Sequence, residues 1–187
     1  MAISSSPEPP SGGRASRILL AVLLAALLLA ALAFVVARQV RAQAQQDPDV
    51  TYITGPTNIT KPGYYVLSTN ITGTQATGYC IGIFASDVVL YGDGLWLRGS
   101  GSGVGIYVAP GSTNVTIEDV GIGGYYAGIV VRSSGVRVVN STVIQDGYGI
   151  AILGDNNTIY GSRVAGEGYD GVYVLGNHTA IVRSHVV

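Results

Sequence analysis

Tyrosines and carboxylates recur together at three places in the second half of the chain. They lie in the segments Gly123-Gly124-Tyr125-Tyr126-Ala127, Gln145-Asp146-Gly147-Tyr148 and Gly166-Glu167-Gly168-Tyr169-Asp170. Aromatic rings pack on the faces of sugar rings, and carboxylates accept hydrogen bonds from sugar hydroxyls. We therefore predict a carbohydrate-binding strip that consists of Tyr125, Tyr126, Asp146, Tyr148, Glu167, Tyr169 and Asp170.

The same residues allow two other interpretations. Two carboxyl groups held about 5 to 9.5 Å apart can act as acid and base in glycoside hydrolysis. Tyr, Gly and Asp are also common at strand ends and in turns, where they serve only to shape and solvate a corner. The spacing of these residues does not separate binding, hydrolysis and a purely structural corner.

A repeated motif follows each of the three segments. It has the form Gly-[Ile/Val]-x-[Val/Ile], and its glycines are Gly105, Gly128, Gly149 and Gly171, separated by 23, 21 and 22 residues. Cys80 takes the glycine position in an earlier copy, Cys80-Ile81-Gly82-Ile83. A fixed period of this length indicates a solenoid. Residues two apart face the same side of a strand, which leaves Tyr107 on the outside.

Two further columns of apolar residues share this period. One column contains Leu90, Ile117, Val138, Ile159 and Ile181, and the other contains Leu95, Ile122, Val143, Val164 and Val186. Each period therefore holds three short β-like pieces without helical periodicity, which excludes leucine-rich and helical repeats. We predict an all-β, right-handed parallel β-helix over residues 51–187, with about six coils of about 22 residues.

The start of this region resembles a known group of proteins. The segments Thr57–Leu67, Asn70–Thr72, Cys80–Ile83 and Asp87–Gly94 are similar to the opening of exported archaeal β-helix proteins. Those proteins resemble the NosD group and the wider carbohydrate-binding and sugar-hydrolase β-helix superfamily. The resemblance implies a right-handed β-helix on a cell envelope, with polysaccharide binding or a structural role, and copper-enzyme maturation in one branch. The catalytic Asp and Arg motifs of the pectin-cleaving families do not map onto this chain, so no catalytic residue is assigned.

Six of the seven asparagines begin an Asn-x-Ser/Thr motif. They are Asn58, Asn70, Asn114, Asn140, Asn156 and Asn177. Such motifs are acceptors for N-linked glycans, so we predict glycosylation of an exported surface domain. A second explanation is that coils must turn at these positions and that Asn tolerates left-handed backbone geometry.

The N-terminal third differs from the repeat. Residues 1–17 are predicted to be a disordered tail, and residues 38–50 a polar linker. Between them, residues 18–37 are uncharged and apolar over a length that matches a bilayer core, which predicts a single hydrophobic helix that is a transmembrane anchor or a signal segment. Cleavage after Ala44 is the alternative to a retained anchor. Either outcome places the β-helix outside the cell membrane.

Charge and cysteine content exclude several partners. Ten Lys and Arg against 11 Asp and Glu leave no basic surplus for nucleic acid. Cys80 is the single cysteine, and His178 and His185 are the two histidines. These residues form no recognisable ligand set, so we expect no metal and no cofactor.

The last apolar column runs to Val186, next to Val187 at the end of the sequence. A coil without a polar cap exposes unpaired backbone groups and an apolar floor. We therefore expect self-association, or docking of another envelope protein, through this coil. Taken together, the sequence predicts a membrane-tethered extracellular scaffold or carbohydrate-binding module. The alternatives are a polysaccharide lyase or glycoside hydrolase and a NosD-like accessory protein in metalloenzyme maturation.

Overall fold

A computed structural model describes residues 50–166 and 168–187. The predicted tail (1–17), the apolar segment (18–37), most of the linker (38–50) and Glu167 lie outside the described residues. Within the described part of the chain, no helix has the length and apolarity needed to cross a bilayer. The described residues form one compact unit.

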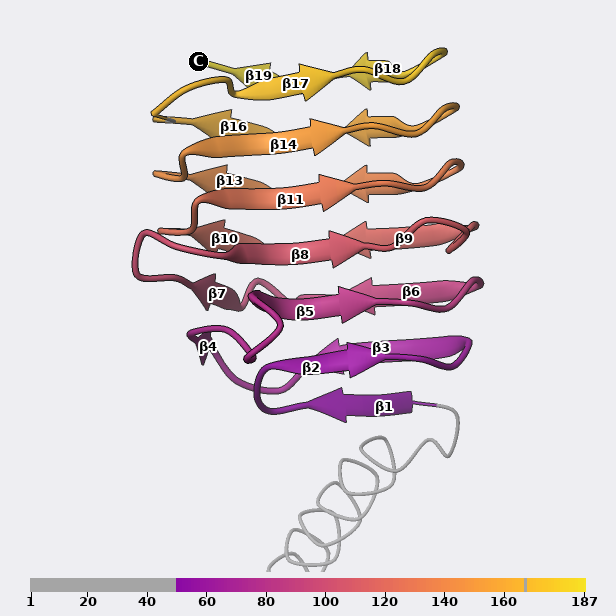
Figure 1. The fold of residues 1–187 in the computed structure, drawn as a ribbon, viewed down its shortest axis with the longest axis vertical. Coiled ribbons are helices and arrows are strands. Elements are labelled where there is room, and N and C mark those ends of the chain that lie inside the picture. Colours follow the sequence, from indigo (N-terminus) through magenta and orange to yellow (C-terminus); the bar gives the residue numbers. More distant parts are fainter. Residues whose placement is uncertain (1–49, 167) are drawn as a thin grey trace, which may run out of the picture. The chain divides into compact units, whose positions relative to one another are not determined.

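Three parallel sheets wind around a common interior in about six turns of a right-handed β-solenoid (Figure 1). Sheet A contains β1 (Val50–Ile53), β3 (Gly63–Leu67), β6 (Val88–Tyr91), β9 (Val115–Glu118), β12 (Arg137–Val139), β15 (Thr158–Tyr160) and β18 (Ala180–Val182). Sheet B contains β2 (Thr57–Ile59), β5 (Tyr79–Ile83), β8 (Val104–Val108), β11 (Ala127–Val131), β14 (Tyr148–Ile152) and β17 (Val172–Val174). Sheet C contains β4 (Ile71–Thr72), β7 (Trp96–Arg98), β10 (Gly121–Gly123), β13 (Thr142–Ile144), β16 (Arg163–Ala165) and β19 (His185–Val186). This confirms the predicted all-β parallel solenoid.

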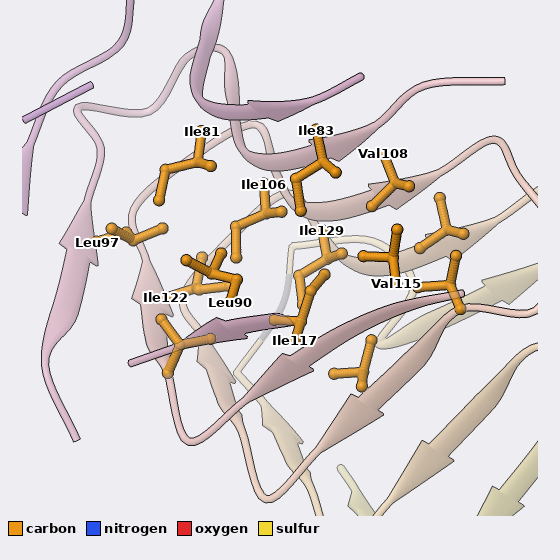
Figure 2. Packing of buried hydrophobic residues seen from close by; sticks show 14 of the residues in the cluster. Ile81, Ile83, Leu90, Leu97, Ile106, Val108, Val115, Ile117, Ile122 and Ile129 are labelled. Carbon is orange, nitrogen blue, oxygen red and sulfur yellow. The ribbon is translucent and has the colours of Figure 1, made fainter. Parts of the chain in front are cut away.

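The interior is built from columns of equivalent apolar residues. Leu90 pairs with Ile117, and the column continues through Val138 and Ile159. The side chains of these four residues are at most 1% exposed. Figure 2 shows Ile117 and Leu90 from sheet A pointing into the same space as residues of sheets B and C. Each buried Ile or Val stabilises the fold by about 1.5 to 3 kcal/mol, so these columns are the main source of stability.

The prediction that Leu95 belongs to the interior column of Ile122 was wrong. Ile122 pairs with Leu97 rather than with Leu95, and Leu97 is completely buried. The corner before β7 contains an additional tight turn, in which the Leu95 N–H donates to the Gly92 carbonyl. This turn lengthens the coil, so Leu95 packs against the core from its edge.

The glycines of the repeated motif lie where successive coils approach most closely. A Cβ atom on Gly128 would come within 2.7 Å of the Gly149 carbonyl oxygen and within 2.5 Å of the Val143 side chain. Gly105 and Gly149 meet the carbonyl oxygens of Gly128 and Gly171 in the same way. A side chain at any of these three glycines would force the coils apart, which explains why the motif returns to Gly in these coils.

Each coil turns at three corners, and residues with left-handed backbone geometry recur at them. Asp93 and several glycines of the longer corners have this geometry in addition to the residues named below. The corner from sheet B to sheet A (the B–A corner) has positive φ at Asp87, Asn114, Gly135, Asn156 and His178. The corner from sheet A to sheet C (the A–C corner) has it at Asp119, Asn140, Gly161 and Arg183. The corner from sheet C to sheet B (the C–B corner) has it at Gly124, Gln145 and Gly166. Short polar residues and Gly tolerate this geometry best.

Buried polar side chains satisfy backbone groups that the corners leave unpaired. The N–H groups of Val120, Ser141 and Ser162 donate to the hydroxyl oxygens of Ser141, Ser162 and Ser184, each one coil further along. Buried backbone N–H groups without a partner would be destabilising, so this ladder of serines supports the coil stack.

The last described coil is less covered than the others. Ile181 and Val186 continue the interior columns, yet their side chains are 46% and 43% exposed. Equivalent residues one coil earlier, Ile159 and Val164, are completely buried.

Candidate functional site

The outer face of sheet B carries aromatic side chains along most of its length. One outward row consists of the register partners Asn58, Gly82, Tyr107, Val130, Ala151 and Tyr173. A second row contains Tyr79, Val104, Ala127 and Tyr148. None of these side chains is charged, so this face is apolar and aromatic with hydroxyl groups at its surface.

Four tyrosines on this face and at its edge form a C-terminal aromatic cluster: Tyr126, Tyr148, Tyr169 and Tyr173. The ring centroids of Tyr148 and Tyr169 are 5.0 Å apart, and those of Tyr126 and Tyr148 are 5.7 Å apart. Tyr173 lies 6.5 Å from Tyr148. Neighbouring coils therefore bring together Tyr126, Tyr148 and Tyr169 of the predicted strip and add Tyr173. The register pairs Tyr148 with Ala127, so the rings of Tyr126 and Tyr148 meet edge to face.

A shallow hollow of about 370 Å³ lies within the C-terminal aromatic cluster. It is lined by aromatic side chains and by small apolar side chains from β11 and β14. The lining residues are Tyr126, Ala127, Val130, Tyr148, Ala151, Leu153, Asp170 and Tyr173. Asp170 is the one carboxylate among these described lining residues. Aromatic and small apolar side chains with one carboxylate suit the face of a sugar ring with its hydroxyls pointing outward.

The surroundings of Tyr148 keep its hydroxyl protonated. Tyr126 has the largest effect in raising the pKa of Tyr148, followed by partial desolvation and the negative charge of Asp170. The phenol is therefore a hydrogen-bond donor at neutral pH.

The structure adds a second group of rings that the sequence pattern did not reveal. Tyr79 and Tyr107 stack with centroids 4.4 Å apart and ring planes within 6° of parallel. Phe84, 44% exposed, lies 6.1 Å from Tyr107. We call Tyr79, Phe84 and Tyr107 the N-terminal aromatic cluster. The expectation that Tyr107 faces outward was correct and was the available signal, but Tyr79 and Phe84 lie outside the 22-residue repeat of tyrosines.

Tyr125 does not belong to the surface, which corrects its assignment to the binding strip. Its side chain is 1% exposed and is the largest in the core. The hydroxyl donates to the Gly73 carbonyl at 3.2 Å, and it also interacts with the Cys80 thiol. Burial and the contact with Cys80 raise the pKa of Tyr125, and burial raises that of Cys80. Gly99 leaves room for the ring, because a Cβ there would lie 2.6 Å from it.

Asp146 is also an interior residue rather than a surface ligand. The carboxylate is 3% exposed, and its Oδ1 accepts a hydrogen bond from the Tyr125 N–H at 2.6 Å. At the C–B corner, Asp146 thus accepts a hydrogen bond from a backbone N–H group, as the ladder of serines does at the A–C corner. A sugar on the outer face of sheet B cannot reach a carboxylate that is covered in this way.

The two remaining acidic residues of the predicted binding strip are Asp170 and Glu167. Asp170 is exposed at the rim of the hollow, whereas Glu167 lies outside the described residues. Hydrolysis needs two carboxyl groups on opposite sides of a bound sugar. The described residues provide one such group at the hollow.

All six predicted glycan acceptors are exposed: Asn58, Asn70, Asn114, Asn140, Asn156 and Asn177. Three of them, Asn114, Asn140 and Asn156, have positive φ values of 53°, 47° and 54°. Residues 50–166 and 168–187 contain no group of three or more His, Cys, Asp or Glu side chains placed to hold a metal ion.

Comparison with known proteins agrees with the architecture. Residues 104–186 match the family model described as a right handed beta helix region. No curated protein and no solved structure matches the chain. The match identifies the fold of this segment, and a fold of this kind hosts many functions.

Proposed function

We propose that this protein is a carbohydrate-binding module that holds a polysaccharide on the outer face of sheet B. The observation that carries the proposal is the presence of aromatic side chains from five successive coils on this face or beside it. They are Tyr79, Tyr107, Tyr148 and Tyr173 in sheet B, and Tyr126 directly before β11. Coils stack at about 4.8 Å, so these rings extend over roughly 20 Å along the solenoid axis. That length accommodates several sugar residues of a linear chain.

The charge of the outer face of sheet B indicates which polysaccharides can bind there. Its two outward rows are uncharged, and Asp170 adds a negative group at the rim of the hollow. A polyanionic chain would be repelled by Asp170 and would find no basic partner in these rows. We therefore propose that the ligand is a neutral polysaccharide.

The proposed location follows from the apolar segment at residues 18–37. An uncharged run of this length is suited to a bilayer, and it precedes the β-helix in the sequence. We propose that it tethers the module to the cell membrane with the β-helix outside.

Binding can be measured by affinity electrophoresis and calorimetry of the full chain with a soluble neutral glucan, mannan and xylan, and with polygalacturonate for comparison. We expect binding to at least one neutral chain. Each aromatic contact contributes about 1 kcal/mol, so Tyr126→Ala and Tyr148→Ala should each weaken binding about fivefold. Tyr64→Ala is the matched control, because Tyr64 is an exposed tyrosine on sheet A.

Two results would contradict the proposal. One is the absence of binding to all of the neutral chains, and the other is equal weakening by Tyr64→Ala and Tyr148→Ala. Reducing ends should be counted in the same mixtures. Their release over time would show a polysaccharide-cleaving enzyme instead of a binding module.

A further inference from the structure

The seven asparagines of the chain fall into two groups in the folded protein. The six that begin an Asn-x-Ser/Thr motif are all exposed. The seventh, Asn157, has no Ser or Thr two residues later, and it is 1% exposed. Its side chain accepts a hydrogen bond from the Val136 N–H and donates to the carbonyls of Ser133 and Gly154. The asparagine with an interior structural task is therefore the one that lacks the motif.

Left-handed backbone geometry at the corners explains only in part why asparagine occurs at the exposed motif positions. Asn114 and Asn156 occupy the positive-φ position of the B–A corner, and Asn140 occupies that of the A–C corner. The equivalent positions in other coils hold Asp87, Gly135, His178, Asp119, Gly161 and Arg183. The corner geometry thus admits several residue types and does not require Asn.

The corner asparagines differ from the other left-handed corner residues in the residue that follows two positions later. After the three corner asparagines it is always threonine: Thr116, Thr142 and Thr158. After the six other corner residues it is Val89, Arg137, Ala180, Gly121, Arg163 and His185. These nine residues are register partners within sheets A and C, so their structural environments are equivalent.

The fold itself supplies no reason for this pairing of Asn with Thr. The strand position accepts Val, Arg and Ala as well as Thr. Among the described residues, none of the three threonine hydroxyls hydrogen-bonds to the asparagine that precedes it. The pairing is explained if the two side chains are recognised together by an enzyme that modifies asparagine.

The spacing of the three sites leaves room for bulky groups. Asn114 and Asn156 are separated by the coil of Gly135, which places them about 10 Å apart along the axis. Asn140 lies on a different corner. Asn177, by contrast, is in the coil next to Asn156, and the hydroxyl of Thr179 is buried.

We propose that Asn114, Asn140 and Asn156 carry N-linked oligosaccharides. The donor is an oligosaccharide joined through pyrophosphate to a lipid carrier, and a transferase of the cell brings it to the chain. The amide Nδ2 forms a bond to the anomeric carbon of the sugar, while the bond from that carbon to the pyrophosphate oxygen breaks. The lipid pyrophosphate leaves and one amide proton is released. Nδ2 retains a hydrogen, so Asn114 keeps its 2.7 Å hydrogen bond to Asp87.

The proposal can be tested by glycopeptide mapping of the full chain purified from its own source cells. We expect sugar masses on the peptides of Asn114, Asn140 and Asn156, and none on Asn157. Thr142→Ala should remove the sugar from Asn140, and Thr142→Ser should retain it. Unmodified corner asparagines, or a sugar on Asn140 that persists in Thr142→Ala, would overturn the proposal.

A transplant of the site tests whether the corner and the hydroxyl are sufficient. The variant Asn140→Gly, Gly161→Asn, Arg163→Thr moves the motif one coil along the A–C corner, where Gly161 has a positive φ of 61°. We expect its sugar on residue 161. The matched control omits Arg163→Thr and should carry no sugar there. Circular dichroism of both variants shows whether they fold, and a folded transplant without a sugar would contradict the proposal.

Discussion

The backbone N–H of Tyr125 donates a 2.6 Å hydrogen bond to Oδ1 of Asp146, one coil further along the chain. This contact ties the C–B corners of two coils together beneath the C-terminal aromatic cluster. Both residues are buried, so a polar pair that resembles ligand-binding residues in the sequence instead supports the surface above it.

Removal of the Asp146 carboxylate should destabilise the fold without a direct effect on glycan binding. A hydrogen bond to a charged group contributes about 1.5 to 3 kcal/mol, and Asp146→Ala would leave a buried N–H unpaired. We expect the free energy of unfolding in urea to fall by about 2 kcal/mol. Asp146→Asn, which keeps an acceptor oxygen, should lose less. Equal losses in the two variants would show that the hydrogen bond to Tyr125 is not the main contribution.

Tyr125 should make stability depend on pH in the alkaline range. Because burial raises the pKa of Tyr125, the folded chain keeps the phenol proton after the unfolded chain has lost it. Stability from this group is therefore complete below the ordinary tyrosine pKa of about 10 and decreases above it, by about 1.4 kcal/mol per pH unit.

Tyr125→Phe removes this dependence together with the hydrogen bond to Gly73. At pH 7 the variant should be less stable by about 1 kcal/mol. Between pH 10 and 11 its stability should decrease less steeply than that of the parent protein. Parallel curves of unfolding free energy against pH would contradict the assignment.

The glycine column predicts a steric effect at Gly128. A methyl group there would meet the Gly149 carbonyl and the Val143 side chain, so Gly128→Ala should destabilise the fold by about 1 to 3 kcal/mol. Gly55 is the control, because a Cβ at that position meets nothing within 4 Å. Thermal unfolding should show a clear decrease for Gly128→Ala and little change for Gly55→Ala. A similar effect of the two substitutions would argue against close approach as the reason for the motif.

A charge in the column of Leu90, Ile117 and Ile181 should destabilise the fold by an amount that depends on the coil. Ile117 is completely buried, so Ile117→Asp should abolish cooperative β-rich unfolding, since an unpaired buried carboxylate is strongly destabilising. Ile181 occupies the same column but is 46% exposed, and Ile181→Asp should be much better tolerated. Circular dichroism melts of the two variants provide the comparison. A folded Ile117→Asp protein with a melting temperature near that of the parent would refute the assignment of Ile117 to a buried interior column.

The solenoid could be predicted from the sequence because its physical requirement repeats. Every coil must present apolar β-branched residues to a narrow interior and glycine where coils meet, so Ile106, Ile129 and Ile150 recur at the period of the coil. The same regularity predicted one strip that contains Tyr126, Tyr148 and Tyr169, whose rings meet edge to face or tilted in the structure. The irregular turn that puts Leu97 in place of Leu95 could not be found in this way, because it departs from the period.

The tertiary structure decided which polar and aromatic residues are available at the surface. A corner residue can point inward to satisfy a backbone group or outward to solvent, and the spacing is the same in both cases. Asp146 and Asn157 point inward because unpaired N–H groups lie within reach, and the ring of Tyr125 enters the core because Gly99 leaves space for it. Sequence alone determined the repeat, and packing between coils selected the side chains that can meet a ligand or a modifying enzyme.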